Sequence, residues 1–67
     1  MSLERDIWLS AGEMIQNYGR LARAEAADRA EDARQRGDSE GSVIWRRIFA
    51  AIEKLQADKP EPGERVQ

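Results

Sequence analysis

The sequence predicts a small all-α protein, and three observations lead to this prediction. Residues 3–18 and 39–57 repeat apolar side chains at the spacing of one face of a helix. Residues 20–36 consist almost entirely of helix-forming residues, with alanines three or four positions apart. Glycines stand between the three segments. We therefore expect a three-helix bundle that forms one domain over residues 1–58.

The first helix is expected over residues 3–18. At 100° per residue, its apolar side chains fall within an arc of about 140°. These side chains are Leu3, Ile7, Trp8, Ala11, Met14, Ile15 and Tyr18. Glu4 and Asp6 place negative charge in the first turn, where the helix dipole favours it. Leu9 alone among the large apolar residues lies on the opposite side.

Gly19 is expected to end the first helix, because glycine readily adopts the left-handed conformation that closes a helix. A lone glycine inside a helix costs only about 1 kcal/mol. The alternative is therefore a bent helical hairpin in which the first and second helices are continuous.

The second helix is expected over residues 20–36 and the third over residues 39–57. Ala22, Ala26, Ala30 and Ala33 form a stripe of small residues on the second helix. Between the two helices, residues 37–41 carry the strongest turn signal, and Asp38 or Ser39 can cap the third helix. The third helix has the richest apolar face, an arc of about 160°. This face comprises Ile44, Trp45, Ile48, Phe49, Ala51, Ile52 and Leu55.

The segment after the third helix shows no apolar pattern. Lys59-Pro60 is expected to stop the helix, because a residue before proline disfavours helical backbone. Residues 59–67 combine proline, glycine and charge, and we expect them to form a disordered tail.

The composition argues against enzymatic, metal and cofactor chemistry. The chain has no Cys and no His, which excludes disulfides, metal sites built on these residues and a histidine base for a nucleophile. Asp28, Glu31 and Asp32 face away from the alanine stripe and are expected to be solvated. The turn at residues 37–41 lacks the lysine of a phosphate-binding loop. We expect no enzyme, no metal, no cofactor and no small-molecule substrate.

The charge balance bears on partners and location. The net charge is −2 with 36% charged residues, whereas general nucleic-acid or membrane binders usually carry a basic excess. The sequence has no run of about 20 apolar residues and its first residues do not resemble a signal peptide. A cytoplasmic protein is expected.

The chain resembles a known family through a spaced set of residues. The set is Tyr18-Gly19, Arg29-Ala30, Gly37-Asp38, Gly41, Trp45-Arg46-Arg47-Ile48 and Ala51-Ile52 with Leu55. Their spacing is similar to that of a family of short bacterial helical proteins described only as a domain of unknown function. The resemblance covers roughly residues 6–56. It implies a compact helical fold and carries no activity, ligand or site.

The apolar residues outside the main faces indicate a partner surface. Val43, Ala50 and Ala57 recur every seven residues on the back of the third helix, a pattern compatible with a helix covered on two sides. Leu9 lies on the back of the first helix, and Trp45 at the edge of an apolar arc. The small core also leaves a lone monomer marginally stable. We therefore predict a protein–protein interaction module that self-associates, for example as a homodimer, or docks on a larger partner.

A small DNA-binding regulator is the alternative function. Arg46 and Arg47 follow a helix–turn and could belong to a recognition helix. Glu40 and Glu53 on the same helix and the acidic chain weigh against this alternative.

Overall fold

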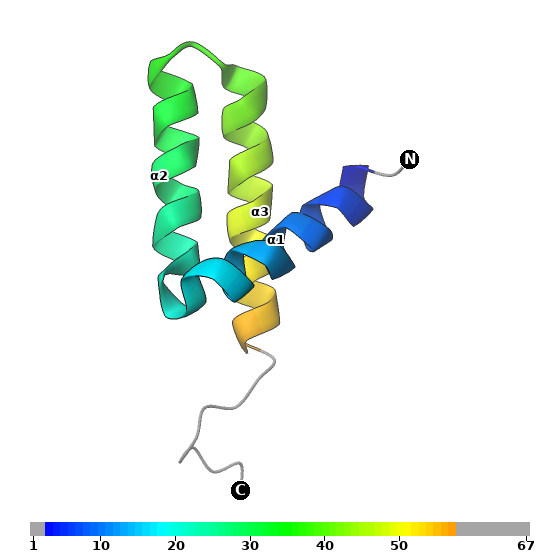
Figure 1. Cartoon of the computed structure of the whole chain (residues 1–67). Helices are drawn as coiled ribbons and strands as arrows, with labels where there is room; N and C mark the ends of the chain where they lie inside the picture. The colour runs from blue at the N-terminus through cyan, green and yellow to red at the C-terminus, as the bar shows by residue number, and fades with distance from the viewer. Residues whose placement is uncertain (1–2, 58–67) are drawn as a thin grey trace, which may run out of the picture.

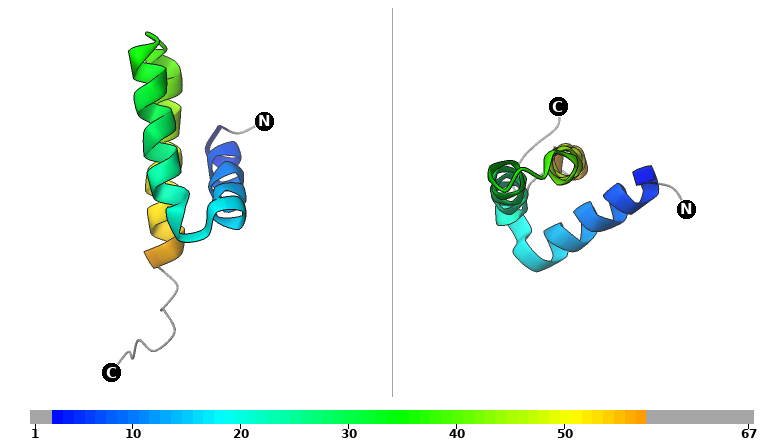
Figure 2. Two further views of the ribbon diagram at one scale, coloured as in Figure 1. Left: turned by 60° about the vertical axis from the view of Figure 1, so that its left-hand side comes forward. Right: turned by 90° about the horizontal axis from the view of Figure 1, so that it is seen from above.

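Residues 3–57 of the computed structural model form helices joined by short turns (Figure 1). The elements are α1 (Leu3–Tyr18), a short 3-10 helix η1 (Gly19–Leu21), α2 (Ala22–Gln35) and α3 (Ser39–Ala57). Helices α2 and α3 run antiparallel and side by side (Figures 1 and 2). Helix α1 crosses this pair at the end away from the α2–α3 turn, and its N-terminus points outward.

The all-α class is confirmed, and the architecture is the alternative one, a bent helical hairpin. The expected break at Gly19 is instead a single 3-10 turn that joins α1 to α2. Gly19 has a φ of 56°, in the left-handed region, and this residue produces the bend. Neither Tyr18 nor Leu21 supplies a side-chain cap at this junction. The expected tail at residues 59–67 lies outside the described residues.

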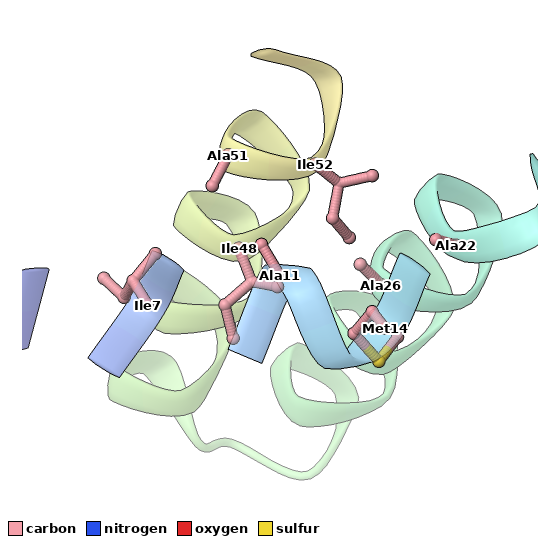
Figure 3. Packing of buried hydrophobic residues seen from close by; sticks show 8 residues of the cluster. All are labelled: Ile7, Ala11, Met14, Ala22, Ala26, Ile48, Ala51 and Ile52. Carbon is pink, nitrogen blue, oxygen red and sulfur yellow. The ribbon is translucent and has the colours of Figure 1, made fainter. Parts of the chain in front are cut away.

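The core is narrow and rich in alanine. Eight side chains from the three helices point toward one another in Figure 3: Ile7, Ala11, Met14, Ala22, Ala26, Ile48, Ala51 and Ile52. Ile52 is the largest side chain that is completely buried. The predicted alanine stripe of α2 is buried in full. Small side chains let helix backbones approach closely, which explains how a helix of low hydrophobicity packs here.

Several residues of the predicted apolar faces are not covered. Leu3, Trp8 and Tyr18 of α1 and Leu55 of α3 are exposed, although their helix positions indicated burial. The reason is the crossing of α1, which covers only the arc carrying Ile7, Ala11 and Met14. A helix that crosses its neighbours contacts them over a shorter length than one that runs alongside them.

The α2–α3 turn satisfies the backbone groups at both helix ends. The N–H groups of Gly37 and Asp38 donate to the carbonyls of Arg34 and Ala33 at 3.0 and 2.8 Å, the Schellman arrangement. Gly37 has a φ of 81°. The Asp38 carboxylate then accepts the Gly41 N–H at 2.9 Å and caps α3. A side chain at position 41 would collide with this carboxylate.

The same substitution at two glycines should have opposite effects on stability. Gly12→Ala should raise the free energy of unfolding by about 1 kcal/mol, because an added Cβ meets nothing and alanine favours the helix. Gly19→Ala should lower it by about 1–2 kcal/mol, because its left-handed backbone penalises a Cβ. Urea unfolding at one fixed protein concentration measures both. Gly19→Asn should lose less than Gly19→Ala, and a stabilising Gly19→Ala would contradict the bend as described.

The Asp38 cap gives a second stability prediction. Asp38→Ala should lower the free energy of unfolding by about 1 kcal/mol, whereas Asp38→Ser should retain most of it, because serine can accept the same N–H. Thermal unfolding followed by circular dichroism distinguishes the two variants. An alanine variant as stable as the natural chain would show that the cap contributes nothing.

Candidate functional site

The predicted partner residues on α3 lie on its exposed side. Helix α3 contacts α1 with one side and α2 with another, and a third side stays open. This outer strip consists of Val43, Arg46, Arg47, Ala50, Lys54 and Ala57, all exposed. Val43 is 47% exposed. Val43, Ala50 and Ala57, spaced seven residues apart, therefore lie on a surface that no other part of residues 3–57 covers.

A groove runs between this strip and α1. The α1–α3 groove has a volume of about 480 Å³ and is lined by Glu4, Ile7, Trp8, Arg47, Ala50, Ala51 and Lys54. Ile7 and Ala51 are nearly covered and form its floor. Trp8 is 38% exposed and forms an aromatic wall. The groove therefore joins an apolar floor to an aromatic side chain that is large enough to anchor a partner.

Charge is divided unevenly across this groove. Arg47 and Lys54 stand seven residues apart on the α3 wall, and Glu4 stands on the α1 wall. Within residues 3–57, neither Arg47 nor Lys54 forms an ion pair. The α3 wall thus offers two cations to a visiting group. Its chemistry suits an apolar side chain flanked by carboxylates.

The groove on the other side of α3 contains an ion pair formed within α2. It has a volume of about 380 Å³ between α2 and α3 and contains Glu31, Arg34 and Arg46 beside Phe49. Arg34 donates twice to the Glu31 carboxylate, and Gln35 donates once. The hydrogen bonds from Arg34, and to a smaller extent the one from Gln35, hold the pKa of Glu31 below its usual value. The hydrogen-bonded Glu31 carboxylate in turn raises the pKa of Arg34. This groove has less unmet charge to offer a partner.

Asp28, Glu31 and Asp32 lie on the exposed side of α2, whereas Glu25 is half-buried. Glu31 pairs with Arg34, and Asp32 pairs with Arg36 at 3.1 Å. Among residues 3–57, no group of three or more acidic side chains is placed to hold a metal ion.

Trp45 lies apart from the other predicted partner residues. It is half-buried and stands about 200° around α3 from Val43, by the helix repeat. The Arg29 guanidinium lies 5.1 Å from the centre of a Trp45 ring and 5.7 Å from the Tyr18 ring. Leu9, another predicted partner residue, lies on α1 and not on the outer strip of α3, and it is 58% exposed. The two tryptophans therefore belong to different surfaces, and Trp8, which helix periodicity placed at the edge of an apolar arc, lines the α1–α3 groove.

Arg29 connects all three α-helices. Its Nε donates to Glu25 at 3.2 Å, and its Nη2 donates to the Tyr18 hydroxyl at 3.0 Å. Tyr18 comes from α1, Arg29 from α2 and Trp45 from α3. Arg29 therefore ties α1, α2 and α3 together.

Arg46 and Arg47, the predicted nucleic-acid contacts, point to different sides of α3. Arg46 lines the groove with α2 and Arg47 the groove with α1. Helices α2 and α3 form an antiparallel hairpin (Figure 1), whereas helix-turn-helix motifs cross at about 90–120°. None of the helices within residues 3–57 has both the length and the apolar character that crossing a membrane requires.

Removing Arg29 should cost more than removing a solvated arginine. Arg29→Ala should lower the free energy of unfolding by about 1–2 kcal/mol, because two aromatic contacts and a partly buried ion pair are lost. Arg36→Ala is the matched control, since its ion pair with Asp32 is exposed, and should change stability by at most about 0.5 kcal/mol. Urea unfolding measures both, and equal effects would contradict a bridging role for Arg29.

Comparisons of the chain with protein-family models, curated proteins and solved structures find no match.

Proposed function

We propose that the protein is a protein–protein interaction module, and that its docking surface is the α1–α3 groove with the outer strip of α3. The observation that carries this proposal is Trp8, which lies 38% exposed in a groove with an apolar floor. Tryptophan is among the residues that contribute most to protein interfaces. Self-association and docking on a larger protein both use such a surface.

The energetic case follows from the area that Trp8 leaves open. A tryptophan side chain can bury up to about 250 Å², so covering its exposed third would contribute roughly 2 kcal/mol at about 25 cal/mol per Å². Leu9 and Val43 are also exposed on the two helices that form the groove. A partner that covered these residues together would gain several times the contribution of any one of them.

The charges that border the groove narrow the class of partner that fits it. Arg47 and Lys54 border the groove without ion pairs inside residues 3–57, so a partner with carboxylates beside an apolar side chain fits best. These cations, with Arg46, also support the alternative of DNA binding through α3. Glu40 on the same helix and the net charge of −2 favour a protein partner.

Substituting Trp8 tests the proposed surface. Trp8→Ala should weaken self-association or partner capture at least tenfold, because the aromatic wall of the groove is lost. Leu21→Ala is the matched control, since Leu21 is 63% exposed but does not line the groove, and should leave association unchanged. Sedimentation equilibrium measures self-association. Affinity capture with each variant as bait measures binding to other proteins.

Two results would overturn the proposal. One is a chain that stays monomeric up to a concentration on the order of 1 mM and captures no protein. The other is association that Trp8→Ala and Leu21→Ala leave equally intact. Binding of mixed-sequence duplex DNA that weakens steeply with added salt would instead support the alternative function.

A further inference from the structure

We infer that the partner in the α1–α3 groove is a second copy of this chain, which inserts the outer face of its own α1. This inference rests on the proposed function and names the occupant of the same surface. It follows from a match between two exposed faces of the molecule, one acidic and one basic.

The acidic face belongs to α1. Asp6, Leu9 and Glu13 stand at positions i, i+3 and i+7, and all three are exposed. Leu9 points away from the core, on the side opposite Ile7 and Ala11, and is 58% exposed. At 1.5 Å per residue, the two carboxylates are separated by about 10.5 Å along the helix. This acidic face therefore presents Leu9 between the carboxylates of Asp6 and Glu13, with Arg5, one turn before Leu9, at its edge.

The basic face belongs to α3 and has the same spacing. Arg47, Ala50 and Lys54 also stand at positions i, i+3 and i+7, and all three line the groove beside Trp8. Their two cations are again about 10.5 Å apart along the helix. Ala50, between them, is small enough to leave room for an incoming leucine.

When the acidic face of one copy lies on the basic face of another, the two carboxylates and the two cations each lie opposite a charge of the other sign. Each carboxylate meets a cation, and Leu9 enters the groove over its alanines, next to Trp8. None of the four charged side chains forms an ion pair within residues 3–57, so pairing between copies breaks no existing bridge. The acids of α2 fit less well, because Glu25, Glu31 and Asp32 already pair with arginines on their own helix.

Glu40 favours an antiparallel arrangement of the two helices. It lies one heptad before Arg47 on α3. In the parallel direction it would approach the acidic first turn of the second α1, which carries Glu4 and Asp6. In the antiparallel direction it approaches the other end of α1, which Arg20 follows. Asp6 then pairs with Lys54, and Glu13 pairs with Arg47.

Charge reversal tests the pairing directly. One variant carries Asp6→Lys and Glu13→Lys, and the other carries Arg47→Glu and Lys54→Glu. Each variant alone should dissociate at least tenfold more readily than the natural chain, because both faces then carry the same sign. An equimolar mixture should regain an affinity within about threefold of the natural chain, because opposite faces are restored between the copies. Sedimentation equilibrium at low salt measures the association of each variant alone and of their mixture.

Controls separate loss of pairing from loss of folding. Asp28→Lys with Asp32→Lys changes the net charge as much as the α1 variant, on the exposed side of α2, and should leave association unchanged. Circular dichroism checks that each variant keeps its helices. If a charge-reversed variant fails to fold, Leu9→Gln tests the same contact and should weaken association at least tenfold.

The outcomes distinguish this inference from the proposed function. Loss in each variant and recovery in the mixture support the second copy as occupant. Association that the reversals leave unchanged overturns the inference, while dependence on Trp8 would still support the interaction surface. A chain that is monomeric up to a concentration on the order of 1 mM also overturns it. In that case, Trp8-dependent capture of another protein decides whether the proposed function survives.

Discussion

Close approach of helices through alanine is the constraint on which this structure depends. Ala11, Ala22 and Ala26 have no exposed surface, and they lie where α1 meets the α2–α3 pair. The chain contains no cysteine, so no disulfide holds these helices together. Larger side chains at these positions would push the helices apart and open the core. The fold therefore tolerates little change at the crossing and much more on its outer surfaces.

The bend at Gly19 determines where α1 lies against the α2–α3 pair. If α1 and α2 formed one straight helix, α1 could not return across α3. If the chain broke completely at Gly19, α1 could run alongside its neighbours and cover their length. The 3-10 turn gives an intermediate arrangement, in which α1 crosses α3 and then diverges from it. The side of α1 that carries Trp8 is left beside the open side of α3. The groove is thus a geometric consequence of one residue with a left-handed backbone.

Periodicity and turn chemistry were enough to predict the helices. Apolar spacing located α1 and α3, and the Gly37-Asp38 pair located the turn, because helix faces and caps are local features of a sequence. Whether Gly19 breaks or bends the chain depends on what α1 packs against, and that was open at the sequence level. The same limit applies to Leu3, Trp8 and Leu55. Spacing shows which side of a helix is apolar, but the crossing angle decides how much of that side is covered.

The candidate site was only partly accessible from sequence for a related reason. Val43, Ala50 and Ala57, which recur every seven residues, lie on the exposed outer strip, but Trp8 joins it only through the placement of α1. Trp45 was grouped with the strip because a tryptophan at the edge of an apolar arc resembles an interface residue. Its contact with Arg29, sixteen positions earlier in the chain, depends on the α2–α3 hairpin and has no local signal.

One further bond ties the bend to the opposite end of the described chain. The Gln56 side-chain amide donates to the Gly19 carbonyl at 3.1 Å, across 37 positions of sequence. The last turn of α3 therefore holds the bend at Gly19. Fraying of that turn would break this hydrogen bond, so the angle between α1 and α3 depends on an intact C-terminal end of α3.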